Sequence, residues 1–337
     1  RFSAEAGEVW VFEVNAARSK SPLDSKIEIL DANGNRMERV RLQAVRDSYI
    51  TFRGIDSNTR DCRLHNWEEM DVNQLLYLNG EVVQLWLWPR GPDSGFQFYP
   101  QTGSRIGLFD TTANSHALQE PCYIVEAHSP GTELIPNGLP VFPIYYENDD
   151  DAMRQLGRDS RLTFTAPAKG QYLVRISDVR GAGGSDFRYE LIARPASPDF
   201  SVRLDGEKRS VPAGSGQEVK FIANRIDGYA GEIAITVDDL PPGFQISQPI
   251  VIESGQYIAY ATVNAAPDAE QPSPEDVAKI RISASAVVNG EQRSKEVSGF
   301  KELKVAAAPK ILVAIGPDRV DAEEITVPKF GQPNPLE

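Results

Sequence analysis

The sequence is poor in the residues that build metal centres and catalytic clusters. Its 337 residues include two cysteines, three histidines and three methionines. The short ligand spacings typical of zinc and iron sites, such as Cys-x-x-Cys and His-x-x-x-His, do not occur, and neither does the Cys-x-x-Cys-His sequence that attaches haem. A Gly-x-Ser-x-Gly nucleophile elbow and an EF-hand loop are also missing. We therefore do not expect an enzyme.

Long apolar runs and clusters of basic residues are missing as well. No run approaches the roughly 18 apolar residues that a membrane-spanning helix needs. The net charge is −13, so the average field of the chain repels phosphate backbones. We expect neither a membrane span nor a nucleic-acid partner. The chain begins at Arg1 within a strand-like segment, which we interpret as the start of a piece processed or excised from a longer protein.

The sequence does contain many short β-forming segments separated by turn residues. Residues 8–14 and 26–30 are rich in β-branched and aromatic side chains, and Asn33-Gly34 is a strong hairpin-turn signal. Only residues 65–78 have the composition of a helical turn or two. Further strands are expected at residues 48–53, 81–88, 96–99, 123–126, 161–165 and 171–176. The predicted fold class is therefore all-β.

The most unusual segment is an acidic run, Tyr145-Tyr146-Glu147-Asn148-Asp149-Asp150-Asp151, placed between strand-like segments. Carboxylates this close repel one another unless a cation or open water surrounds them. Ca²⁺ is a hard cation that takes about six to eight oxygen ligands, so an acidic loop held between strands suits it. The alternative is a solvated acidic loop.

Several segments, in order and spacing, resemble the bacterial pre-peptidase C-terminal domain, in particular its version in large secreted planctomycete proteins. Those segments are Ser21-Pro22-Leu23-Asp24-Ser25, residues 27–34, Asn148-Asp149-Asp150, and residues 159–162, 170–175 and 186–191. The resemblance implies a small jelly-roll-like β-sandwich, often calcium-binding, appended to exported proteins and usually not catalytic. One departure is that residues 37–144 separate the strand ending near Gly34 from the Asn-Asp-Asp loop, which the family joins closely.

This pattern predicts four parts. Residues 1–36 and 145–194 would form the split β-sandwich, and residues 37–144 a β-rich insertion within it. After a proline-punctuated linker, residues 199–306 show strand signals at the spacing of a second sandwich. The segment Asp239-Leu240-Pro241-Pro242-Gly243-Phe244 resembles the loop of bacterial immunoglobulin-like repeats. Residues 307–337 would be a linker with a tail or the start of a further module.

The candidate calcium ligands are oxygen-bearing side chains of the acidic loop and of two segments that strand pairing would bring near it. Successive residues of an extended chain point in opposite directions, so the loop aspartates need a turn to serve one ion. The candidate ligands are Asp24, Asn148, Asp149, Asp150, Asp151 and Asp159.

The insertion holds two further groups of candidates. Trp86 and Trp88 lie two apart and so share a strand face, and Phe96 and Tyr99 follow after a turn. Exposed, these four aromatic residues would stack on sugar rings, whereas buried they would form the insertion's core. The insertion also holds both cysteines and all histidines: Cys62, Cys122, His65, His116 and His128.

The two cysteines fit either a single disulfide in an oxidising compartment or two buried thiols. The histidines leave open a metal site, for which His65 with Glu68 and Glu69 would be the best local group.

We expect a non-catalytic, calcium-stabilised accessory or interaction module of a larger exported bacterial protein, located in the periplasm, at the cell surface or outside the cell. Its partners would be other domains of the parent protein and extracellular polysaccharide or protein. The alternatives are a carbohydrate-binding module that uses the aromatic face of the insertion, and a metal-dependent enzyme centred on its histidines.

Overall fold

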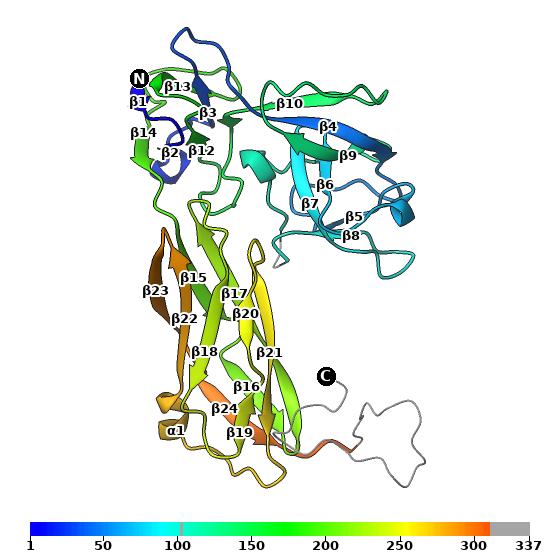
Figure 1. The fold of residues 1–337 in the computed structure, drawn as a ribbon, viewed down its shortest axis with the longest axis vertical. Coiled ribbons are helices and arrows are strands. Elements are labelled where there is room, and N and C mark those ends of the chain that lie inside the picture. The colour runs from blue at the N-terminus through cyan, green and yellow to red at the C-terminus, as the bar shows by residue number, and fades with distance from the viewer. Residues whose placement is uncertain (102–103, 311–337) are drawn as a thin grey trace. The chain divides into compact units, whose positions relative to one another are not determined.

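The computed structural model describes residues 1–101 and 104–310, in two compact units. The first extends from Arg1 to Ser197 and the second begins at Pro198. Antiparallel strands dominate both units (Figure 1), so the all-β prediction is confirmed. None of the helices in the described ranges has the length and apolar character to cross a membrane.

The first unit contains a β-sandwich of two small sheets. Apolar side chains alternate along these strands and meet between the sheets, where Phe12, Ile27, Ile29, Leu162 and Phe164 form the core. One sheet has the order β1 (Phe2–Ala4), β13 (Gly170–Asp178), β3 (Ser25–Leu30), β11 (Glu147–Asn148). The other has the order β12 (Arg161–Thr165), β2 (Val9–Asn15), β14 (Glu190–Pro195).

The strands between β3 and β11 in sequence form a seven-stranded sheet of their own. Apolar side chains on its two faces make separate clusters, one around Leu42 and Val82 and a larger one around Leu85 and Phe96. The strand order is β10 (Val141–Tyr145), β4 (Glu38–Tyr49), β9 (Pro121–His128), β6 (Leu75–Leu78), β7 (Glu81–Leu87), β8 (Phe96–Phe98), β5 (Asp61–Cys62). We call residues 37–145 the insertion.

Two sequence predictions in the insertion need correction. A strand was expected at 48–53, but β4 runs from Glu38 to Tyr49, because its charged residues alternate with buried Val40, Leu42 and Ala44. The expected helical turns at 65–78 are one 3₁₀ turn, Trp67–Glu69, followed by β6. Two other 3₁₀ turns are Ala17–Ser19 and Leu108–Asp110.

The second unit is a sandwich of two four-stranded sheets around one apolar core that includes Phe200, Phe221, Ile235 and Ile282. One sheet has the order β15 (Asp199–Leu204), β17 (Ser215–Ile226), β21 (Ile258–Ala265), β19 (Phe244–Ile246). The other has the order β20 (Ile250–Ile252), β18 (Ile233–Asp238), β22 (Arg281–Val288), β23 (Glu291–Val297). The parallel pair β16 (Lys208–Pro212) and β24 (Glu302–Ala306) completes the unit.

A short helix, α1 (Pro274–Lys279), directly precedes β22. Ser273 and Asp276 form a capping box, and Pro274 occupies the first turn, where its missing N–H is not needed. The further module expected after residue 307 lies almost wholly outside the described residues.

Candidate functional site

The acidic loop begins at β11 and is organised by the buried side chain of Asn148. Its Nδ2 donates to the Arg161 carbonyl at 3.0 Å. Its Oδ1 accepts from the Asp150 amide at 3.0 Å and from the Thr112 hydroxyl at 2.7 Å. Asn148 thereby bends the chain into the turn that the run of aspartates requires, and it ties this loop to the insertion.

Asp159, a predicted calcium ligand, is instead a fully buried cap for the 3₁₀ turn at Ala17–Ser19. Its Oδ1 accepts from the amides of Ala16 and Ala17 at 3.0 and 2.6 Å, and its Oδ2 accepts from the Arg18 amide and Nε at 3.1 and 2.7 Å. Burial opposes ionisation, but the hydrogen bonds from Arg18 and the amides hold the pKa of Asp159 below its ordinary value. Both oxygens are already engaged.

Asp151 also has a structural role. It is buried, and its two carboxylate oxygens accept from the amides of Met153 and Gln155 at 3.2 and 2.7 Å. This pattern fixes the turn that follows the acidic loop. Asp151 and Asp159 therefore fit a metal ion poorly, because binding one would break hydrogen bonds to main-chain amides.

The remaining predicted ligands, Asp24, Asp149 and Asp150, gather at one place. Burial, followed by the charges of Asp149 and Asp24, raises the pKa of Asp150 above its ordinary value. Asp149 Oδ1 accepts from the Thr112 hydroxyl at 2.5 Å. The negative charges of Asp149 and Asp24 therefore disfavour ionisation of the half-buried Asp150.

Of the predicted ligands, these three carboxylates suit Ca²⁺ best. Calcium binds oxygen ligands, and its positive charge would offset the repulsion between the carboxylates. As the side chains are placed, no group of three or more histidine, cysteine, aspartate or glutamate residues in 1–101 and 104–310 is arranged to hold a metal ion. Binding would require the side chains of Asp24, Asp149 and Asp150 to turn toward a common point.

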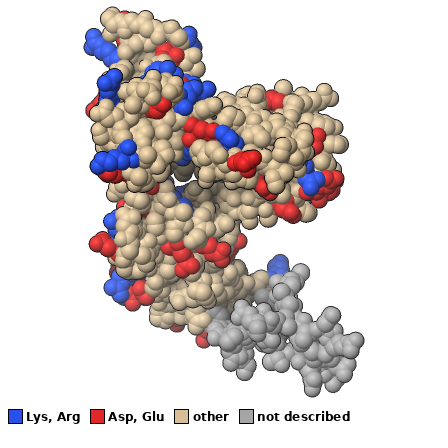
Figure 2. Space-filling view, turned by 45° about the horizontal axis from the view of Figure 1, so that its top comes forward, with Lys and Arg blue, Asp and Glu red and all other residues tan. Residues whose placement is uncertain are grey.

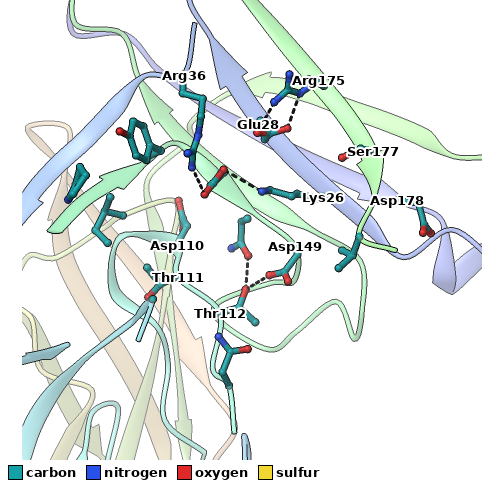
Figure 3. Close-up of a pocket in the computed structure, with 18 of the residues that line it drawn as sticks. Lys26, Glu28, Arg36, Asp110, Thr111, Thr112, Asp149, Arg175, Ser177 and Asp178 are labelled. Atoms are coloured by element: carbon teal, nitrogen blue, oxygen red, sulfur yellow. Dashed lines mark hydrogen bonds and ion pairs between the residues drawn. The ribbon is translucent and has the colours of Figure 1, made fainter. Parts of the chain in front are cut away.

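A polar cleft of about 740 Å³ lies beside this group, between the β1-β13-β3-β11 sheet and the insertion. Figure 3 shows that its sheet wall carries a row of paired charges. Arg175 donates to both oxygens of Glu28 at 2.6 and 2.7 Å. This hydrogen bonding lowers the pKa of Glu28, although burial acts in the opposite direction.

Glu147 extends this row onto β11, where it lies opposite Glu28 in the strand register. Lys26 and Arg36 both pair with its carboxylate, at 3.1 and 2.5 Å. The adjacent Asp178 accepts three main-chain amides, led by that of Asp24, and its pKa is lowered to about 2. Most charges of this wall are thus paired with one another or bound by the backbone, although Glu147 Oε2 lies 3.1 Å from Lys26 Nζ without a hydrogen bond.

The opposite wall of the cleft is the segment 110–114 of the insertion together with the end of β10. Asp110 accepts from Arg39 and from the Thr163 amide, so it joins the insertion to β12. Thr112 reaches the acidic loop, as described above, and the side chain of Asn114 is exposed at the cleft.

Behind this wall lies a buried polar network that no motif in the sequence predicts. Arg105, fully buried, donates to both oxygens of Glu81 at 2.6 and 3.1 Å. His116 contacts Glu81 Oε2 at 2.8 Å and Glu120 Oε1 at 2.9 Å. Burial would lower the pKa of His116, but hydrogen bonds to the two carboxylates raise it above its ordinary value.

The same network anchors the cleft wall through the main chain. The Asn114 amide donates to Glu81 Oε2 at 3.0 Å, and the Asn114 carbonyl accepts from Arg105 at 2.6 Å. The members of this cluster come from three separate segments, at Glu81, at Arg105 and at residues 114–120, so no spacing rule in the sequence marks it.

Of the two alternatives for the aromatic residues of the insertion, a sugar-binding platform and a core, the core holds for Phe96 and Tyr99. Phe96 and Tyr99 are buried in the insertion's core, at 0% and 5% exposure, so they cannot share a surface with Trp88, which is 41% exposed. A bulge between Leu85 and Leu87 interrupts the pairing of β7 at Trp86, which is half-buried. Trp88 instead packs edge-on against Trp67, with ring centroids 6.3 Å apart.

Both cysteines are free and buried, so the structure has two thiols in place of the disulfide that was one of the two expected states. Burial raises the pKa of Cys62, and it raises the pKa of Cys122 to about 12. Thiolates at these positions would be costly, which makes the cysteines core residues. His65 stacks on Tyr49 at 4.6 Å.

On the face of the molecule drawn in Figure 2, basic side chains lie in separate small groups among acidic and uncharged ones. The expectation that nucleic acid is not a partner stays a prediction, based on the net charge of −13.

No protein-family model and no curated protein matches the sequence. One similar solved structure is surface layer protein SbsC, domains 1–6, with 10% identity and a TM-score of 0.22. The alignment covers 92% of this chain and 54% of that one, so the chain spans about half its length. A similarity this low carries no argument about function, and the resemblance to the pre-peptidase C-terminal domain stays a prediction.

The sequence prediction missed the cleft, although one signal for it exists. Lys26 and Glu28 alternate with the buried Ile27 and Ile29 on β3, which marks the outer face of that strand as charged. Which residues would face them depends on the strand register and on the position of the insertion, and neither can be read from spacing.

Proposed function

We propose that residues 1–197 form a non-catalytic, calcium-stabilised module of a larger exported bacterial protein, with other domains of that protein as partners. The observation that carries this proposal is the turn of the acidic loop, in which buried Asn148 accepts from the Asp150 amide and Thr112 bonds to Asp149, and the burial and neighbouring charges that raise the pKa of Asp150 support it. The ordered acidic loop and the resemblance to the pre-peptidase C-terminal domain support the same interpretation.

The position of the three carboxylates suggests what calcium would do. Asp24 directly precedes β3, after which the chain enters the insertion, and Asp149 and Asp150 follow β11, where the chain has returned to the sandwich. A cation held by these residues would join the start of β3 to the loop after β11, and this loop also contacts Thr112 of the insertion. Because the ion would bind the folded loop better than the unfolded chain, it would stabilise the fold by about 2.7 kcal/mol at a hundredfold excess over Kd.

The test is thermal unfolding of the purified chain in EDTA and in increasing CaCl₂, together with calorimetric titration of Ca²⁺. We expect the melting temperature of the first unit to rise with calcium, and one ion to bind per chain. Asp150→Asn removes one repelling charge, so it should raise the melting temperature in EDTA and weaken calcium binding at least tenfold.

Asp186→Asn is the matched control, because Asp186 is an exposed aspartate of the same unit and is not part of this group. It should leave both measurements unchanged. A melting temperature that is the same in EDTA and in millimolar calcium would refute the calcium proposal.

A further inference from the structure

We propose that the cleft between the β1-β13-β3-β11 sheet and the insertion binds a neutral, hydroxyl-rich ligand, that is, a saccharide. This site goes beyond the proposed calcium function and does not depend on it. The cleft measures about 740 Å³, which falls within the range of about 300–1,000 Å³ typical of small-molecule sites. Its lining is mostly polar, unlike the usual apolar pocket, so its ligand should be polar too.

The pairing of charges on the sheet wall decides which polar ligand fits. Glu28 is bound by Arg175, and Glu147 is bound by both Lys26 and Arg36. An anionic ligand would have to displace a carboxylate to reach these cations, and a cationic ligand would have to displace an arginine or lysine. Glu28 and Glu147 are only 9% and 28% exposed, so an anion that displaced either of them would leave a partly desolvated carboxylate without its partner, which is costly. A strongly anionic ligand is therefore disfavoured.

A hydroxyl group can donate and accept at the same time. Adjacent hydroxyls can thus accept from a guanidinium and donate to the carboxylate paired with it, while the ion pair stays intact. Arg175 with Glu28 presents such a two-bonded pair, and Glu147 between Arg36 and Lys26 presents a second group of donors and acceptors (Figure 3). Two such pairs on neighbouring strands match the closely spaced hydroxyls of a sugar ring.

The opposite wall is held in place before any ligand arrives. The main chain of Asn114 is bound on both sides by the buried Glu81 and Arg105, while its side chain is exposed at the cleft. A wall whose backbone is fixed by a buried network loses little conformational entropy on binding. Tyr77 and Tyr145 add ring surface to the lining, and such surface packs against the C–H groups of sugars.

The test is affinity gel electrophoresis of the full chain in gels that contain one soluble polysaccharide each. The neutral probes are mannan, xylan, laminarin and dextran, and the charged probes are alginate and heparin. We expect at least one neutral polymer to retard migration and the charged polymers to have no effect at physiological ionic strength. Asn114→Trp would fill the cleft from its anchored wall and should weaken the retardation at least tenfold.

Ser115→Trp is the matched control, since Ser115 is exposed and adjacent but does not line the cleft. It should bind as the unmodified chain does, and circular dichroism should show that both variants fold. Three results would each overturn the proposal: no neutral polymer retards the chain, a charged polymer retards it at least as strongly, or Asn114→Trp binds normally.

The same gels separate this proposal from the calcium proposal. Asp24 is not part of the cleft lining, so Asp24→Asn should abolish the calcium response in melting curves and leave saccharide binding in EDTA unchanged. Loss of binding in Asp24→Asn with Asn114→Trp unaffected would assign the saccharide to the acidic loop and overturn the cleft site.

Discussion

Two arginines are buried in residues 1–101 and 104–310, Arg105 and Arg225, and their charges are bound in different ways. In the insertion, Arg105 is paired with a carboxylate, that of Glu81, and with the carbonyls of Asp56, Thr59 and Asn114. In the second unit, Arg225 is bound by main-chain carbonyls, those of Gln256, Glu253, Gly231 and Tyr229.

The difference shows two solutions to the cost of burying a charge. The carboxylate solution brings a titratable group into the core, and His116 then adds a second one. The carbonyl solution uses main-chain dipoles, which do not titrate, together with the rings of Tyr229 and Tyr257, although burial lowers the pKa of Arg225. We therefore expect the stability of the insertion to depend on the charges of these side chains and on pH. The stability of the core around Arg225 should depend mainly on the hydrogen-bond donors of the guanidinium.

The largest effect is expected for Glu81→Gln. This change removes the carboxylate that both Arg105 and His116 contact in a fully buried place, and breaking a buried pair costs about 3–5 kcal/mol. Urea unfolding followed by hydrogen exchange should locate the loss in β7, β9 and the segment 105–116. Glu69→Gln, which removes an exposed partner of Arg46, should have little effect. Equal stability of the two variants would contradict the role of the network.

A smaller effect is expected for Arg225→Met, which keeps the apolar part of the side chain but removes every donor. Each buried carbonyl left without a partner costs about 1–3 kcal/mol, so we expect a loss of about 2 kcal/mol or more in the second unit. Arg225→Lys should fall between the two, because an ammonium cannot reach all of these carbonyls. If the lysine variant were as stable as the arginine, the carbonyl geometry would not matter.

The smallest effect is expected from pH alone. The pKa of His116 is raised in the folded state. Its contribution to the free energy of unfolding is therefore complete below the unfolded-state pKa of about 6.5, and it is lost as pH rises through the folded-state pKa. Glu81 and Glu120 have lowered pKa values, so their contribution is present above about 4.5 and is lost as pH falls through the folded values.

Hydrogen exchange of intact chain at stepped pH, corrected for intrinsic rates, measures this dependence by region. The insertion should lose protection between neutral and alkaline pH, whereas β17 and β18 around Arg225 should not. His116→Gln should remove the alkaline dependence. A uniform response of both regions would mean that the histidine does not contribute.

The sequence predicted the fold class because alternation and turn chemistry are local. Strands such as β2, β3 and β21 carry apolar residues at every second position, and their turns contain glycine or asparagine. The prediction failed for β4 because its outer residues, including Arg39 and Arg41, are strongly charged, so its composition concealed the alternation.

The candidate site was predictable only in part, for a physical reason. The run of aspartates is visible as a local excess of charge, but whether a carboxylate is free depends on distant main-chain amides, as Asp159 and the amides of Ala16 and Ala17 show. Likewise, the buried pair of Arg105 and Glu81 depends on three-dimensional packing and has no spacing signature.

The pairing of β4 with β10 has a consequence for how this chain could be rebuilt. Glu38 lies opposite Tyr145, and the Tyr146 amide donates to the Met37 carbonyl at 3.0 Å, so the two ends of the insertion are neighbours. Adjacent ends allow a segment to be excised, exchanged or circularly permuted with little strain. A different domain can therefore be inserted into the sandwich between Met37 and Tyr146.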